Sequence, residues 1–359
     1  MRRVLAVSLL LLPLTAATLG CGDDSSGLPD PTPPPSGEPI DAPKNAWTWI
    51  DFPDSACDDG SPTGIAVSQG DSKNLLVFLN GGGACWNFLT CFQLNTATHG
   101  PFGKTQFEAL TGQLGSTIFD RKLPNNPFAD WNLVFVPYCT GDVHAGDNVT
   151  EYKDSNGVAR TYHHVGRANI AAYLKRLGTT FSPEKLVVSG SSAGGFGAAF
   201  DYDLFRAAFP SARGYLVDDS GPALKGEAIS SSLRAAWYQS WRLDKALDTS
   251  CPECRNDLSQ AMKHTAQRFP QDRLALLSST QDSVIRSYFM LTPDSFQTSL
   301  NTTLTDVLEP LPNFRAYISA GQFHTFLGSP DAHPAQGVKL TDWLRQMVQE
   351  DAGWQSLKP

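Results

Sequence analysis

Residues 186–195 read Leu-Val-Val-Ser-Gly-Ser-Ser-Ala-Gly-Gly, a short apolar run followed directly by serines and glycines. The run predicts a buried strand, and the small residues after it predict a sharp turn into a helix. Ser192 is central in that turn, between Gly190 and Gly194. A serine on such a turn projects outward, and the amides of the following helix face a developing oxyanion. We therefore predict that Ser192 is a nucleophile; the alternative is an ordinary tight turn.

Five other apolar runs have the length of buried strands: 75–79, 131–136, 215–217, 274–277 and 314–318. Segments with helical spacing lie between several of them, at 165–177, 196–209, 233–247 and 340–348. Runs that are apolar on both faces suit parallel strands covered by helices. We therefore predict an α/β fold that is α/β-hydrolase-like, with a mostly parallel central sheet flanked by helices in a single domain.

A serine nucleophile needs a base, which in this type of fold follows the nucleophile and an acid along the chain. His324 comes after the last predicted strand and a turn at 319–322. It can therefore lie over the carboxyl edge of the sheet. The other histidines precede Ser192 or, like His264 and His333, lie in segments that we expect to face solvent. We therefore predict that His324 is the base.

For the acid we favour Asp282, which follows the strand predicted at 274–277. The alternative role for Asp282 is an N-cap of the segment from residue 284 onward, which aspartate fills well. Asp218 and Asp219 follow another strand and compete for the acid role.

Three glycines, at positions 81–83, follow Asn80 and the first predicted strand. Consecutive glycines allow the backbone to approach a substrate closely and to turn its N–H groups toward it. With the N–H of Ala193, these residues predict an oxyanion hole. A phosphate cradle is disfavoured because no Gly-Lys-Ser/Thr follows the glycines.

The first residues have the order of a secretory signal: Arg2 and Arg3, an apolar run at 4–14, then small residues. We predict a signal peptide at 1–20. Thr-Leu-Gly before Cys21 resembles a bacterial lipobox, which predicts lipidation of Cys21 and an exported, outer-membrane-anchored lipoprotein. A secreted or periplasmic protein is the alternative. The proline-rich segment 21–41 predicts a disordered linker, which leaves 42–359 as the folded domain.

Charge and cysteine content exclude several classes of protein. The net charge is −8 and no long basic run occurs, so we expect no nucleic-acid partner. Six cysteines follow Cys21, and an even number in an exported chain favours disulfides. Cys251 and Cys254 suit a local disulfide better than a metal site, because no second pair of ligands completes a zinc set. We therefore expect no metal.

Four pieces of the sequence together resemble the pectin acetylesterases, whose animal relative Notum is a lipid-removing carboxylesterase. The pieces lie at 78–85, 137–143, 190–195 and 323–325. The resemblance covers roughly residues 45–350, and its Tyr-Cys piece is the most specific because generic hydrolases lack it. Asn80 departs from the pattern, since relatives carry glutamate there. Gly83 stands where Notum has a bulky aromatic residue, which looks closer to the sugar-ester branch.

This resemblance implies a triad, an oxyanion hole and two disulfides. The triad is Ser192, Asp282 and His324, and the oxyanion amides are those of Gly81, Gly82 and Ala193. The implied disulfides are Cys57–Cys139 and Cys85–Cys91, which leaves Cys251–Cys254 as a local pair.

We therefore expect a serine carboxylesterase without a cofactor that hydrolyses acetyl esters on a polysaccharide such as pectin. One alternative is a lipid or thioester hydrolase of the Notum type. Another is a non-catalytic surface protein that binds carbohydrate through some of the chain's eight tryptophans. We expect membrane contact only through the N-terminal lipid, and the sequence does not indicate an oligomeric state.

Overall fold

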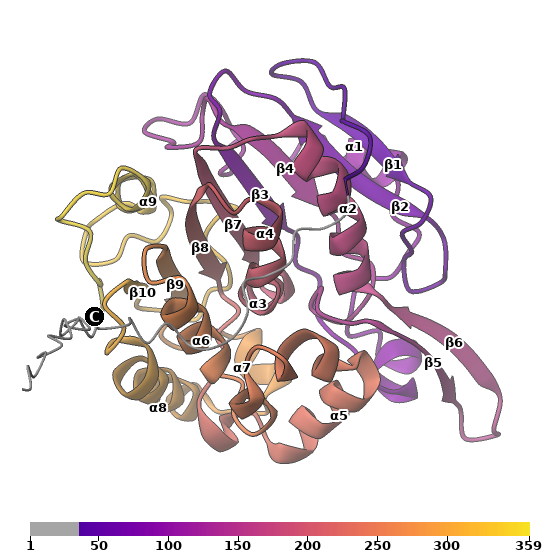
Figure 1. Ribbon diagram of the computed structural model, residues 1–359. Helices are drawn as coiled ribbons and strands as arrows, with labels where there is room; N and C mark the ends of the chain where they lie inside the picture. The colour runs from indigo at the N-terminus through magenta and orange to yellow at the C-terminus, as the bar shows by residue number, and fades with distance from the viewer. Residues whose placement is uncertain (1–35) are drawn as a thin grey trace, which may run out of the picture.

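The structure is a computed structural model that describes residues 36–359 (Figure 1). The predicted signal peptide, the lipidation of Cys21 and the predicted linker as far as residue 35 lie outside the described residues. Between residues 36 and 359, none of the helices combines the length and the hydrophobicity needed to span a bilayer.

An eight-stranded sheet in the order β1-β2-β4-β3-β7-β8-β9-β10 forms the centre of the molecule. The six strands from β4 to β10 in that order are parallel, and β1 and β2 add an antiparallel edge. The strands are β1 (Thr48–Phe52), β2 (Thr63–Ser68), β3 (Leu75–Leu79), β4 (Asn132–Val136), β7 (Lys185–Ser191), β8 (Arg213–Asp219), β9 (Arg273–Ser279) and β10 (Phe314–Ser319). Every predicted apolar run forms one of the six parallel strands, so the predicted fold class is confirmed.

Helices cover both faces of this sheet because side chains along each parallel strand alternate between two cores. Leu75, Val77 and Leu79 of β3 point into one core, and Leu76 and Phe78 point into the other. The first core is closed by α2 through α8 and the second by α1 and α9 (Figure 1). The helices are α1 (Lys104–Thr111), α2 (Gly166–Thr180), α3 (Ala193–Phe200), α4 (Tyr202–Ala208), α5 (Ser231–Trp241), α6 (Gln260–Arg268), α7 (Ile285–Tyr288), α8 (Pro293–Thr303) and α9 (Leu340–Val348).

Two predicted helices are interrupted. The helix predicted at 196–209 is divided into α3 and α4 at Asp201, whose buried carboxylate pairs with Arg167. The helix predicted at 233–247 ends as α5 before Arg242, which is left-handed at φ 57°. A hairpin that we did not predict, β5 (Asn148–Lys153) with β6 (Ala159–His164), extends from the body near α5 (Figure 1).

The three expected disulfides are confirmed: Cys57–Cys139, Cys85–Cys91 and Cys251–Cys254. The first fixes the loop after β4 to the loop between β1 and β2. The second closes a short loop directly after the glycines at 81–83.

The folded part begins earlier than expected, because residues 37–40 of the predicted linker pack on α2. The N–H of Gly37 donates to the Lys175 carbonyl at 2.8 Å, and the N–H of Ile40 donates to Thr180 Oγ1 at 2.7 Å. The Ile40 side chain is only 4% exposed and belongs to the core. The boundary at residue 42 is therefore wrong by about five residues.

Replacing Ile40 should destabilise the whole domain if this segment is part of the fold. We expect Ile40→Ala to lower the free energy of unfolding in urea by about 2–4 kcal/mol, as for other buried aliphatic side chains. Glu38→Ala is the control because the Glu38 side chain is exposed. Equal urea midpoints for Ile40→Ala and the wild type would contradict the packing described for this segment.

Candidate functional site

Ser192 lies at the junction of β7 and α3, with φ 60° and ψ −120°. A residue other than glycine rarely adopts this backbone conformation, and it persists only where neighbouring contacts enforce it. The neighbours on both sides must be small. A Cβ on Gly190 would lie 2.2 Å from the Gly194 carbonyl oxygen, and one on Gly194 would lie 1.9 Å from that of Leu79. The glycines of the motif are therefore required by close backbone packing.

The buried carboxylate of Asp219 connects this turn to the loop that follows β10. Ser191 Oγ donates to Asp219 Oδ2 at 2.6 Å, and the N–H of Ser192 donates to the Asp219 main-chain oxygen at 2.7 Å. From the other side, the N–H of Phe326 donates to Oδ1 at 2.9 Å and that of Leu327 donates to Oδ2 at 3.0 Å. Asp219 therefore holds two segments, more than 100 residues apart in the sequence, in one arrangement.

Asp282 contacts His324 directly. His324 Nδ1 donates to Asp282 Oδ2 at 2.7 Å, and Asp282 is fully buried. The other oxygen, Oδ1, accepts from the N–H of Val284 at 2.9 Å and of Ile285 at 3.0 Å. One oxygen of Asp282 therefore contacts the imidazole, while the other accepts from two N–H groups at the turn that leads into α7.

The second ring nitrogen of His324 is available for a proton. Because a carboxylate only accepts hydrogen bonds, this network assigns the proton of the neutral ring to Nδ1. Nε2 is buried and has no hydrogen-bond partner among residues 36–359. The ring of His324 is paired with Asp282, and not with Asp218 or Asp219.

The remaining histidines are used elsewhere. We expected His264 to face solvent, but it is half-buried because α6 packs on the core. This burial lowers the pKa of His264. His333 stacks on Phe323 with ring centroids 3.6 Å apart. His164 lies near the sulfurs of Cys85 and Cys91. Those sulfurs form a disulfide, and both nitrogens of His164 are hydrogen-bonded, so this cluster does not offer a metal site.

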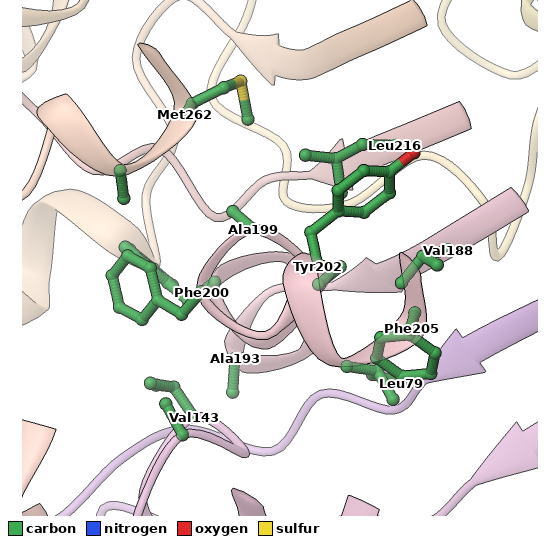
Figure 2. Packing of buried hydrophobic residues seen from close by; sticks show 14 of the residues in the cluster. Leu79, Val143, Val188, Ala193, Ala199, Phe200, Tyr202, Phe205, Leu216 and Met262 are labelled. Atoms are coloured by element: carbon green, nitrogen blue, oxygen red, sulfur yellow. The ribbon is translucent and has the colours of Figure 1, made fainter. Parts of the chain in front are cut away.

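A small, mostly apolar cavity of about 20 Å³ opens beside Ser192. It is lined by Gly83, Ala84, Val143, Ser192, Ala193, Phe196, Trp237, Ile285, Tyr288 and Phe289. Ala193 points from the start of α3 toward Val143 (Figure 2). We did not predict the side chains of this wall, because an aromatic residue with helical spacing has the same pattern whether it faces a core or a cavity.

The glycine segment 81–83 lies against the serine. A Cβ on Gly81 would be 3.0 Å from Ser192 Cβ, so only glycine brings this backbone so close. Gly83 has φ 78°, and a Cβ there would meet the Thr96 carbonyl oxygen at 2.1 Å. Within residues 36–359 the N–H groups of Gly81 and Gly82 donate no hydrogen bond to a main-chain oxygen.

Asp218 is also fully buried, but its environment differs from that of Asp219. Its Oδ1 accepts from the N–H of Gly221 at 2.8 Å. Burial raises the pKa of Asp218 to about 8, with a smaller contribution from the neighbouring Asp219. Asp218 is therefore protonated at neutral pH.

This raised pKa predicts a pH-dependent effect of Asp218→Asn. As the pH rises from about 4 to about 8, the unfolded carboxyl loses its proton while the folded one keeps it, so Asp218 reduces wild-type stability progressively. Asparagine keeps an acceptor for Gly221 and has no proton to lose. In urea unfolding we expect Asp218→Asn to exceed the wild type in stability at pH 8 and to gain less at pH 5. The exposed Asp54→Asn is the control. An Asp218→Asn gain that is equal at both pH values would contradict the raised pKa.

Comparisons with known proteins identify the family of this chain. The family model described as pectinacetylesterase matches residues 48–285. The palmitoleoyl-protein carboxylesterase NOTUM of Schmidtea mediterranea is 31% identical over 163 residues, which cover 43% of this chain and 30% of that protein. The human NOTUM is 29% identical over 176 residues, 46% of this chain and 34% of that protein. Pectin acetylesterase 11 of Arabidopsis thaliana is 28% identical over 182 residues, 49% of this chain and 44% of that protein. The matches thus span less than half the length of these relatives.

The fold has a counterpart among solved structures. The Wnt deacylase Notum from Drosophila superposes with a TM-score of 0.60 and 17% identity, over 88% of this chain and 96% of that one. At this identity the likeness concerns the fold alone. The family model covers more than half of the chain, including the nucleophile turn and Asp282, and the chain therefore belongs to the pectinacetylesterase family.

Proposed function

We propose that this protein is a serine carboxylesterase that uses Ser192, His324 and Asp282. The observation that carries the proposal is the Asp282–His324 hydrogen bond of 2.7 Å, with the other ring nitrogen unpartnered within residues 36–359. The strained Ser192 at the apolar cavity supplies the nucleophile. A protein that only binds carbohydrate has no use for this arrangement.

The first half of the reaction forms an acyl-enzyme. His324 Nε2 takes the proton of Ser192 Oγ as the oxygen attacks the carbonyl carbon of the ester. Asp282 stabilises the imidazolium that results. The oxyanion is bound by N–H groups of Gly81, Gly82 and Ala193, and His324 then gives its proton to the leaving alcohol.

The second half releases the acid. A water molecule enters, His324 Nε2 takes one of its protons, and the hydroxide attacks the acyl carbon. When this intermediate collapses, the bond to Ser192 breaks, the proton returns to Oγ and the free carboxylic acid leaves. No cofactor or metal is needed at any step.

We propose acetyl groups on a polysaccharide such as pectin as the substrate. Support comes from membership of the pectinacetylesterase family and from Gly83. A side chain at this position would meet Tyr288 Oη at 2.4 Å, so Tyr288 fills the space of a larger residue 83 and limits the cavity on that side.

Hydrolysis of longer acyl esters is a second candidate, because aromatic side chains line the cavity beside Ser192. Phe196, Trp237 and Phe289 contribute three aromatic rings to its wall. Two of the relatives are described as palmitoleoyl-protein carboxylesterases.

We further propose that the protein is exported. The three disulfides are typical of an oxidising compartment. Together with the predicted signal peptide and Cys21, they support an outer-membrane-anchored lipoprotein, or otherwise a secreted or periplasmic enzyme.

The test is hydrolysis of p-nitrophenyl esters from acetate to palmitate. We expect the wild type to prefer short chains and Ser192→Ala to lose at least about 10⁴-fold in kcat, because the nucleophile is removed. Ser189→Ala is a matched control on β7, the strand that leads into Ser192, because the Ser189 hydroxyl donates to the Val217 carbonyl and not to Asp219; its expected loss is below about tenfold. A preference for long chains would favour the second candidate. Carbohydrate binding without hydrolysis of any ester would overturn the esterase proposal in favour of a binding protein.

Asp219→Asn should impair catalysis without removing a reacting group. An amide cannot accept hydrogen bonds from both sides, so either the nucleophile turn or the loop of Phe326 loses its anchor. We expect kcat to fall by about 10–100-fold, since small misplacements of reacting groups are costly. Asp218→Asn, the adjacent isosteric change, should keep kcat within about threefold of the wild type. Equal kcat values for the two variants would contradict a special role of Asp219.

A further inference from the structure

The loop at 138–146, which follows β4, has no part in the steps above, although every residue in it is buried. It contains the Tyr-Cys sequence at 138–139. It lies beside the nucleophile helix, because a Cβ on Gly197 of α3 would come within 2.7 Å of the Val143 carbonyl oxygen and 2.8 Å of His144 Cβ.

Two consecutive residues of this loop are left-handed: Val143 at φ 51° and His144 at φ 65°. The conformation is unfavourable for a β-branched residue such as valine. Strain of this kind typically costs about 1–3 kcal/mol per residue and persists only where surrounding contacts fix it.

Two buried side chains fix the strained pair. Tyr138 Oη accepts from the N–H of Val143 at 2.8 Å. The Asp142 carboxylate accepts from the N–H of His144 at 3.1 Å and from that of Gly166 at 2.8 Å. Burial raises the pKa of Asp142 to about 6. The loop therefore has a single conformation, although that conformation is unfavourable in isolation.

This loop conformation determines where the His144 ring lies. Its Nε2 lies 2.8 Å from the carbonyl oxygen of Asn80. A carbonyl only accepts, so Nε2 carries the proton and donates. Burial lowers the pKa of His144 to about 4, which keeps the ring neutral at neutral pH.

The Asn80 carbonyl and the Gly81 N–H belong to the same planar peptide group and point in opposite directions. Fixing the carbonyl therefore fixes the N–H. A hydrogen bond to the carbonyl also polarises the peptide and strengthens its N–H as a donor. Gly81 is the glycine whose Cβ would be 3.0 Å from Ser192 Cβ, so this peptide lies beside the nucleophile.

We propose that His144 is a positioning residue that holds the Asn80–Gly81 peptide in the orientation that binds the oxyanion. This inference rests on the proposed esterase function. The support acts on the main chain and does not depend on the side chain of residue 80.

Two substitutions of His144 separate positioning from bulk. The amide nitrogen of glutamine is as many bonds from Cα as Nε2 of histidine, whereas that of asparagine is one bond short. We expect His144→Asn to lower kcat on p-nitrophenyl acetate by about 10–100-fold with KM within about threefold, somewhat less than the loss of an oxyanion donor. His144→Gln should stay within about fivefold of the wild-type kcat. Asparagine tolerates the left-handed conformation, so the expected loss does not arise from added strain.

A transition-state analogue gives a second measurement that a purely structural role would not change. A methyl trifluoromethyl ketone forms a tetrahedral oxyanion with Ser192, so its affinity should fall across the variants in proportion to kcat/KM. Thermal stability should not follow that order. Wild-type kcat in a folded His144→Asn protein, or equal losses in the glutamine and asparagine variants, would overturn the proposal.

Gly197→Ala tests the same contact if His144→Asn does not fold. Its Cβ would push on the Val143 carbonyl oxygen and on His144, whereas Gly178→Ala in α2 would meet only the Ala208 carbonyl oxygen at an ordinary 3.6 Å. We expect a loss in kcat of about tenfold or more for Gly197→Ala and none for Gly178→Ala; equal kcat values would overturn the proposal. An inactive wild type would instead contradict the esterase function itself, and the comparison with Ser192→Ala identifies that case.

Discussion

The structure of this site depends on the backbone of Ser192, which turns from a strand into a helix through a left-handed conformation. No serine adopts φ 60° without support from its surroundings. The support comes from the main-chain oxygen of Asp219, which accepts the N–H of Ser192, and from two glycines that let β7 and α3 meet at their backbones. The close approach of Gly194 to the carbonyl of Leu79 then fixes where β3 ends, and therefore where the glycine segment after β3 begins. The predicted oxyanion loop and the nucleophile turn thus depend on the same close backbone packing.

Two buried aspartates, Asp219 and Asp282, make the other contacts that hold the site together. Asp219 accepts hydrogen bonds from the nucleophile turn and from the loop after β10, so it sets the distance between the segments that carry Ser192 and His324. Asp282 contacts the ring of His324 and orients it. Asp218, next to Asp219 in sequence, contributes to neither contact and is protonated at neutral pH. Burial alone therefore does not distinguish these aspartates, whereas the hydrogen-bond partners of each oxygen do.

Sequence reasoning located the parallel strands, because continuous apolar runs are distinctive, and it brought Asp282 and His324 to adjacent strand ends. It missed β1, β2 and the hairpin, whose apolar runs are short or interrupted by polar residues, although Gly157 in the hairpin turn was a usable signal. It placed the end of the linker too late, because proline-rich composition does not reveal that Ile40 finds a core. The role proposed for His144 could not be predicted from the sequence either. The hydrogen bond from His144 to Asn80 depends on two left-handed residues, and no residue type in the segment indicates that conformation.

The cap made by Asp282 links the chemistry to the shape of the cavity. Asp282 accepts hydrogen bonds from the N–H groups of Val284 and Ile285, where α7 begins. Helix α7 and the residue after it supply Ile285, Tyr288 and Phe289 to the cavity wall. A change in α7 large enough to lengthen the cavity would disturb the carboxylate that orients His324. Phe196 and Trp237, on α3 and α5, are not tied to Asp282 in this way. A change in acyl-chain preference is therefore more easily reached through those two positions than through α7, because there the wall can change without moving Asp282.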